Sequence, residues 1–289
     1  MKRWLEVVFA LWLALAASSA LAALAAVVES VQMPAWVERA GKQLPAAPGI
    51  ELIATDTLRT GPGARLYIKL AEGSMLKLGE NAKLQLLDLV PEKGGLFRGV
   101  IDVLSGAFRF TTDVLAKPRP RDFKLRISTV TAGIRGTDLW GRSVKDNEIV
   151  CLIEGAIEVG AENEKPVRMD QPRQFYQRDQ GKTQPLSVIT QEKLAELARE
   201  TDIETGKGAA RRGGKWKVIL ASADNQAAAL AVYDGARDGG YAAEIRPAQA
   251  GGKLVYHVRI ANLPSKAEGE VLAASLRGRF GILEPRVTN

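Results

Sequence analysis

The stretch Trp216-Lys-Val-Ile-Leu-Ala221 opens the segment that decides the fold of the C-terminal part of this chain, residues 215–289. It is a short apolar run rich in β-forming residues, and it predicts a strand. The residues that follow it repeat at the spacing of one helix face: Ala229, Val232, Tyr233 and Ala236. Gly239-Gly240 then predicts the end of this helix, because glycine adopts the left-handed C-terminal conformation at little cost.

Two strands, a second helix and a last strand are predicted after this point. The strands cover residues 241–246 and 254–261, and residues 283–287 close the unit. Ser265 and Glu268 have the spacing of a capping box at the start of the second helix. The order β-α-β-β-α-β is typical of the ferredoxin-like fold, a four-stranded antiparallel sheet with two helices on one face. The other face is uncovered, so we expect a ligand to bind there.

Composition and charge indicate a globular protein with a basic C-terminal part. The chain has 289 residues, of which 46% are hydrophobic and 25% charged, and its length suits two domains. The net charge is +7, and residues 207–289 hold 13 Lys and Arg against 7 Asp and Glu, so 13 − 7 = +6 lies in this third of the chain. A basic unit favours an anionic polymer or surface as its partner, whereas the plainer interpretation is that these charges only provide solubility.

The first 22 residues have the three parts of a secretory signal peptide. Met1-Lys2-Arg3 is positively charged, residues 7–17 are apolar, and Ala20-Leu-Ala22 is a small-x-small cleavage site. We therefore predict that residues 1–22 are removed and that the protein is periplasmic. The alternative is an uncleaved inner-membrane anchor, because the apolar run continues to Val28 and is long enough to cross a bilayer. Only the anchor would bring the protein to a membrane, and export in either form argues against nucleic acid as a partner.

The sequence pattern of residues 27–176 predicts an all-β domain. Apolar and polar residues alternate in Leu66 to Leu70, Phe108-Arg-Phe110 and Ile157-Glu-Val159. This period of two means that one face of each strand is buried. Short strands separated by glycine turns favour a sandwich, a β-roll or a short β-helix. With the C-terminal unit, the fold class is predicted to be α+β.

Four motifs in this region resemble the FecR-like domain of exported bacterial proteins. They are Leu58-Arg-Thr-Gly61, Leu76-Lys-Leu78-Gly79, Gly106-Ala-Phe-Arg109 and Thr131-Ala-Gly-Ile-Arg-Gly-Thr-Asp138. In the protein that gives the family its name, the domain relays a signal to a sigma factor through a separate cytoplasmic segment. Only six residues precede the apolar run here, so we do not expect iron-responsive signalling.

Five residues of the last motif are expected to build a structural corner of the β domain: Gly133, Arg135, Gly136, Thr137 and Asp138. Glycine suits a tight turn with positive φ. The Asp and Thr side chains could bond local amides, and the Arg could pair with a carboxylate. A ligand-binding loop is the alternative.

The connector between the domains is predicted at residues 177–214. Thr190 is expected to cap a short helix over residues 191–203, and residues 206–214 are expected to form a flexible basic linker because they combine glycines with Lys and Arg. The position of this helix relative to the β domain does not follow from its sequence.

A search for catalytic and metal-binding patterns favours a binding protein over an enzyme. The chain has one histidine, His257, and one cysteine, Cys151, too few for a His or Cys/His metal site, and we expect no cofactor. Cys151 lies in an aliphatic run and is predicted to be a buried thiol. Ser74-Met-Leu-Lys77 matches the S-x-x-K pattern of acyl enzymes but falls in a β alternation without the companion motifs, so we interpret it as chance. Paired carboxylates of a glycan hydrolase depend on spatial distance and stay open.

The C-terminal unit resembles the SPOR (sporulation-related repeat) domain over residues 215–289. The matching motifs are Trp216-Lys-Val with Ala221-Ser222, Gly239-Gly240-Tyr241, Val255-Tyr-His-Val-Arg-Ile260 and Ser265-Lys-Ala-Glu268. The resemblance implies binding to peptidoglycan, at glycan strands stripped of their stem peptides, across the exposed sheet face. Strand alternation and the resemblance together suggest the binding residues: Lys217, Ile219, Ser222, Val255, His257 and Arg259.

The sequence departs from the family at two places. Ile219 stands where the family often has glutamine, and Ala261-Asn262 stands where it often has Gly-Pro. A protein whose β domain recognises another envelope protein, with no glycan binding, is therefore a second hypothesis. RNA binding is a third, but it needs aromatic residues on the central strands, and only Tyr256 is available, on the opposite alternation.

Overall fold

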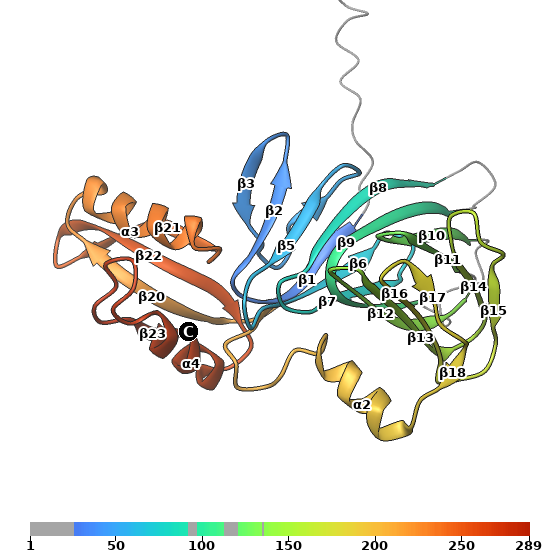
Figure 1. Cartoon of the computed structure of the whole chain (residues 1–289). Helices are drawn as coiled ribbons and strands as arrows, with labels where there is room; N and C mark the ends of the chain where they lie inside the picture. The colour runs from blue at the N-terminus through green and yellow to red at the C-terminus, as the bar shows by residue number, and fades with distance from the viewer. Residues whose placement is uncertain (1–25, 92–96, 113–120, 135) are drawn as a thin grey trace, which may run out of the picture.

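The computed structural model describes residues 26–91, 97–112, 121–134 and 136–289 (Figure 1). The predicted signal peptide and Arg135 lie outside the described residues. In the described part of the chain, no helix is long and apolar enough to cross a membrane.

Within the described ranges, strands β1 to β18 build the β domain, and together with β19 they form one continuous nineteen-stranded sheet that folds into two layers. The strands of the first layer are β1 (Ala26–Gln32), β4 (Glu51–Leu52), β6 (Arg65–Leu70), β7 (Met75–Leu78), β9 (Phe97–Thr111), β12 (Asp138–Val144), β13 (Asn147–Glu154), β16 (Gln174–Asp179), β17 (Lys182–Thr183), β18 (Ser187–Val188) and β19 (Ala210–Arg211). Those of the second layer are β2 (Ala35–Arg39), β3 (Lys42–Pro45), β5 (Thr57–Thr60), β8 (Lys83–Pro91), β10 (Arg121–Ile127), β11 (Val130–Ile134), β14 (Ile157–Ala161) and β15 (Val167–Met169). The prediction of a mostly β N-terminal region is confirmed.

Strand β9 joins the two layers. Its first part pairs with β8 and, in parallel, with β10, whereas its last part pairs with β7 and β12. Between them lies Gly106, whose φ of +87° is strained for other residues, and a Cβ there would lie 2.5 Å from Cα of Ala82. Strands that pass from one sheet to another commonly bend at such a point. Glycine at this position therefore lets one strand serve both layers.

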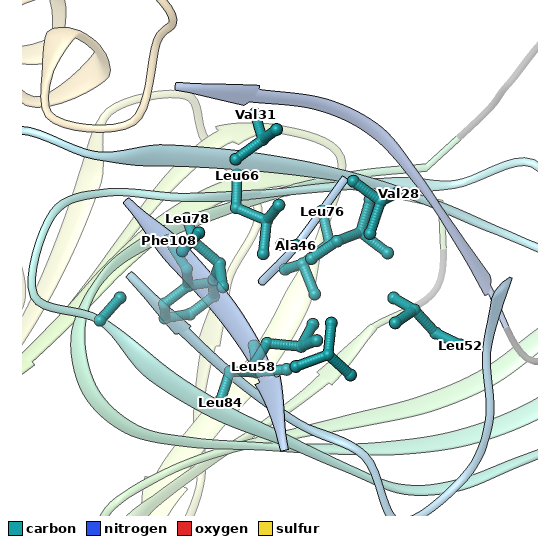
Figure 2. Close-up of a cluster of buried hydrophobic side chains, with 14 of the residues drawn as sticks. Val28, Val31, Ala46, Leu52, Leu58, Leu66, Leu76, Leu78, Leu84 and Phe108 are labelled. Carbon is teal, nitrogen blue, oxygen red and sulfur yellow. The ribbon is translucent and has the colours of Figure 1, made fainter. Parts of the chain in front are cut away.

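The core lies between the layers (Figure 2). Strand β6 buries every second residue, as its sequence predicts. Leu66, Leu76 and Phe108 of the first layer gather in the same cluster as Leu58 and Leu84 of the second, and all five are fully buried. Two facing sheets with a shared apolar interior correspond to the sandwich among the predicted alternatives.

The connector helix α2 (Gln191–Arg199) packs on the outer side of the first layer. Leu197 is buried against Trp140, Ile149 and Cys151. The helix ends four residues before the predicted position because the residues after it bind the β domain: Glu200 pairs with Arg142, and Asp202 with Lys77. The amide of Ile203 donates to the hydroxyl of Tyr67 at 2.6 Å.

The segment expected to be a flexible linker is instead held on both sides. Strand β19 within it pairs with β1, so it belongs to the sheet of the β domain. On the other side, the carboxylate of Glu268 accepts hydrogen bonds from the amides of Gly206, Gly208 and Ala209, at 2.6, 2.6 and 3.2 Å. Sequence reasoning missed this because none of these contacts is local.

The C-terminal unit contains the predicted order of elements: β20 (Trp216–Ala223), α3 (Gln226–Asp238), β21 (Ala243–Ala250), β22 (Lys253–Leu263), α4 (Lys266–Leu276) and β23 (Arg286–Thr288). All strand pairs are antiparallel, in the order β21-β22-β20-β23. The helices pack on one face of this sheet, where Val218, Val258 and Ile260 are buried and Gly269 of α4 lies against Val287. The side chain of Ser265 accepts a hydrogen bond from the amide of Glu268, as the capping box predicts. The side chain of Glu268, however, binds the connector and not the amide of Ser265.

Candidate functional site

Two rows of residues cross the sheet of the C-terminal unit on the face away from its helices. Residues opposite each other in neighbouring antiparallel strands share a face, so strand register defines each row. The first row runs through β23, β20, β22 and β21 as Arg286, Ile219, Arg259 and Glu244. The second runs through β20, β22 and β21 as Ser222, His257 and Arg246. We call these residues, with Lys217, the sheet-face site.

Ser222, His257 and Arg286 form a hydrogen-bonded cluster at one side of this site. Nη2 of Arg286 donates to Oγ of Ser222 at 3.0 Å, and the same Oγ lies 2.8 Å from Nδ1 of His257. In the histidine tautomer with its proton on Nε2, the serine hydroxyl donates to Nδ1. The Nε2–H group is then a donor for a ligand. Ser222 and Arg286 are exposed and His257 is half-buried, so the cluster faces solvent.

Glu244 holds two arginines on the other side of the site. It accepts from Nε of Arg259 at 2.8 Å and from Nη2 of Arg246 at 2.9 Å. One carboxylate therefore stands among four cationic side chains: Lys217, Arg246, Arg259 and Arg286. This excess of positive charge favours anionic or strongly hydrogen-bonding ligands.

The six residues suggested from the sequence contribute unequally to this surface. Ser222, His257 and Arg259 lie on the same face of the sheet, and Lys217 lies on the neighbouring strand opposite Thr288 of β23. Ile219 pairs with Arg259 on the same face but is only 8% exposed, because long arginine side chains flank it on both neighbouring strands. Val255 lies farther along β22, half-buried, opposite Ala248.

Sequence reasoning missed Arg286, Arg246 and Glu244. Arg286 belongs to the predicted last strand, and the alternation of side chains along that strand was the only sign that it could face the ligand. The register of β23 against β20, which places Arg286 beside Ser222, is a long-range property that the alternation does not contain. Arg246 and Glu244 were on a predicted strand whose residues were not assigned to a face.

The described residues of the motif at 131–138 lie in β11, at the start of β12 and in the turn before β12. Asp138 accepts a bidentate hydrogen bond from Nε and Nη2 of Arg109, at 2.9 and 2.6 Å, and another from Oγ1 of Thr111. This hydrogen bond to Asp138 raises the pKa of the Arg109 guanidinium. Gly136 has the positive φ of a turn, +71°, and the backbones of Thr137 and Thr112 are joined by a hydrogen bond. Gly133 lies on β11, with open space where a Cβ would be.

The residues that were considered for catalysis, Ser74, Lys77 and Cys151, are buried or ion-paired. Ser74 is buried at the turn before β7, and the ammonium of Lys77 pairs with Asp202 at 2.6 Å. Burial raises the pKa of the Cys151 thiol to about 12, which keeps it protonated. Among the described residues, no three His, Cys, Asp or Glu side chains are grouped so that they could hold a metal ion.

A second open surface lies on the β domain. It is a polar cleft of about 600 Å³ across β10, β11 and β14. Arg126, paired with Asp102 at 3.3 Å, lies at one side, and Glu158 and Thr131 also line it.

Comparison with known families assigns both parts of the chain. Residues 56–158 match the model of the FecR protein family, and residues 213–282 match the SPOR domain. The chain contains a FecR domain followed by a SPOR domain. The SPOR match includes β20 to β22 and both helices of the C-terminal unit, whereas Arg286 lies beyond it. The FecR match begins at residue 56, so strands β1 to β4 lie outside it.

Other comparisons give weaker relations. A search of curated proteins finds no match. Two crystal structures of a candidate anti-sigma factor from Parabacteroides distasonis resemble the chain at 11% and 10% identity. The first covers 69% of this chain and 97% of its own, with a TM-score of 0.39. The second covers 72% of this chain and 99% of its own, with a TM-score of 0.41.

Proposed function

We propose that this protein is a non-catalytic cell-envelope protein that binds the glycan strands of peptidoglycan through the sheet-face site of its SPOR domain. The observation that carries the proposal is the Arg286–Ser222–His257 cluster, which lies with three further cations on the sheet face away from the helices. We further propose that this unit has the ferredoxin-like fold, which its strand order β21-β22-β20-β23 supports.

The chemistry of the site suits a glycan without stem peptides. Such a strand presents hydroxyl and acetamido groups, and each muramic acid carries a free carboxylate once its peptide is removed. Arginines bind carboxylates through charge-assisted, often bidentate hydrogen bonds, and the Ser222–His257 pair supplies neutral donors and acceptors. An intact stem peptide would remove this carboxylate by forming an amide, so we expect a preference for denuded strands.

Export to the periplasm completes the proposal. The sequence of residues 1–22 favours a signal peptide, and both domain families are associated with the cell envelope. The FecR domain would make a second contact in the envelope, for which the polar cleft between Arg126 and Glu158 is a suitable surface. The alternative is a periplasmic protein-interaction or signalling module without glycan binding, which the FecR match would also accommodate.

Sedimentation with purified sacculi tests glycan binding. We expect the protein to pellet with sacculi, and more strongly after an amidase has removed the stem peptides. Arg286→Ala should weaken this binding roughly tenfold, because a hydrogen bond from a charged group typically contributes about 1.5–3 kcal/mol. Arg168→Ala is the matched control, since Arg168 is also an exposed arginine but pairs with Asp170 on the β domain. No pelleting with either preparation would contradict the proposal.

A further inference from the structure

A cleft of about 450 Å³ lies between the β domain and the edge of the SPOR sheet. The β domain lines it with apolar residues of β3 and the loop after it, among them Leu44, Pro48 and Ile50. The SPOR domain lines it with three charged residues at the end of α3 and on β21, Arg237, Glu244 and Arg246, and with uncharged residues of β21 and β22 and the residue before β21: Ala242, Ala243, Ile260, Ala261 and Asn262. The wall from the β domain is therefore mainly aliphatic, and the wall from the SPOR domain combines apolar residues with charged groups that can donate and accept hydrogen bonds.

Direct contacts join the two domains beside this cleft. The amide of Ala35 on β2 donates to the carbonyl of Gly240 at 3.1 Å. The ring of Trp36 lies so close to Gly240 that a Cβ there would be 2.6 Å from it, and the amide of Ala242 lies 3.3 Å from Sδ of Met33. Figure 1 shows the SPOR domain beside β2 and β3 of the β domain. These β-domain contacts come from residues 33–36, which lie outside the FecR match.

The cleft continues the sheet-face site. Glu244 and Arg246 line the cleft and also belong to the two rows that cross the sheet. Glu244 is ion-paired with Arg259 at 2.8 Å, so the cleft and the face share one network of charges. A long ligand on the sheet face that runs along this row toward β21 reaches the cleft directly.

Two features of β21 favour a glycan over an added peptide strand in this cleft. β21 is an edge strand, but Pro247 within it has no amide hydrogen to donate. The carbonyl of Ala243 already accepts from Nη1 of Arg237 at 3.3 Å. In contrast, an aliphatic wall opposite charged hydrogen-bonding groups is suited to a sugar, which has apolar ring faces and polar edges.

We propose that this cleft is a second subsite for the same glycan strand, so that the ligand contacts the β domain as well as the SPOR domain. The inference rests on the proposed function of the sheet-face site and adds residues 44–50 to it. Because the two subsites are adjacent and share Glu244 and Arg246, a chain that spans both should bind more tightly than a fragment that fills only one.

Binding of soluble glycans without stem peptides, as a single disaccharide and as chains of several disaccharides, tests the inference by calorimetry on the whole protein. Leu44 is 38% exposed, so Leu44→Glu leaves the fold intact while it removes the aliphatic wall and repels carboxylates. We expect this change to weaken the binding of long chains roughly tenfold and to leave the single disaccharide unaffected. Leu104→Glu is the matched control, because Leu104 is 43% exposed on β9, away from the cleft, and should leave both affinities unchanged.

The outcomes separate the two proposals. If Leu44→Glu binds all lengths like the unmodified protein while Arg286→Ala is weakened, the cleft does not hold glycan and the inference is overturned, although the proposed function stands. If the unmodified protein binds neither glycan, both are overturned. A thermal melt of each variant checks that the folded state is retained.

Discussion

At the scale of single residues, the environment of Cys151 shows how packing controls chemistry. Its side chain is fully buried beneath α2, between Trp140 and Leu197. A thiolate there would lose its hydration without gaining a cationic partner, so burial raises the pKa of the Cys151 thiol to about 12. The cysteine is therefore kept as a neutral core residue.

We predict that Cys151 reacts with a thiol reagent at pH 8 only after the protein is unfolded in urea. The raised folded-state pKa also makes stability depend on pH. The contribution of the protonated thiol is fully present below the unfolded pKa of about 9 and is lost as pH rises toward the folded pKa of about 12. Between pH 8 and pH 10 the free energy of unfolding of the unmodified protein should fall by roughly 1 kcal/mol more than that of Cys151→Ala. Equal losses in urea titrations of both proteins would contradict this.

At the scale of elements, helix ends bind segments distant in the chain. The first turn of α4 carries Glu268, which is 5% exposed and holds the amides of the connector. Its position at a helix N-terminus favours the negative charge. Helix α2 anchors the same connector by burying Leu197. The connector thus depends on two helices, one on each side.

Glu268→Gln should lower the free energy of unfolding by about 2 kcal/mol, because a glutamine has one acceptor oxygen and its amino group would face backbone N–H donors. Faster hydrogen exchange at residues 206–209 would locate the loss in the connector. Glu270→Gln, on the exposed side of the same helix beside Lys266, is the control and should change stability by less than about 0.5 kcal/mol. Similar effects of both substitutions would show that the connector is not held by Glu268.

Leu197→Ala should lower the free energy of unfolding by about 2–3 kcal/mol, since it removes a buried side chain from the contact between α2 and Trp140. We expect α2 to exchange its amide hydrogens faster in this variant, as measured by mass spectrometry. Leu186→Ala, at a position 37% exposed, is the matched control and should leave the exchange of α2 unchanged. Normal protection of α2 in Leu197→Ala would disprove its role as the anchor.

At the scale of the whole molecule, the β domain and the SPOR domain form a single docked body. Strand β19 pairs with β1, the connector binds α4, and Gly240 lies against Trp36. Relative domain motion is the usual expectation for two domains joined by a short connector. Here contacts from three separate segments join the domains, so we expect this motion to be smaller than usual.

Gly240→Ala should loosen this docking, because the new Cβ would overlap the ring of Trp36 as well as occupy a φ of +82°. Gly251→Ala is the matched control. Its φ is also positive, +58°, but a Cβ there has no atom within 4 Å, so it should show only the backbone cost of about 1–2 kcal/mol. Small-angle X-ray scattering should give a larger radius of gyration for Gly240→Ala than for Gly251→Ala, and equal radii would contradict the docking role.

Periodicity and local motifs determined much of this protein from the sequence alone. The alternation of Leu66, Ile68 and Leu70, the helix after Asn225, the cap at Ser265 and the buried Cys151 all depend on neighbouring residues, and the two family resemblances arise from short contiguous motifs. The extent of α2 was predicted incorrectly, and the contacts of residues 206–214 were not foreseen, because their partners lie elsewhere in the chain.

Only the tertiary structure decided how these parts meet. Arg286 joins Ser222 from 64 positions away, and Trp36 meets the end of α3 across 202 positions. Such contacts depend on the register of β23 and on the docking of two domains, which no local pattern encodes. The sequence therefore determined which elements form and which face of each is buried. The assembled fold decided which side chains build the sheet-face site and created the cleft beside it, because both arise from long-range packing.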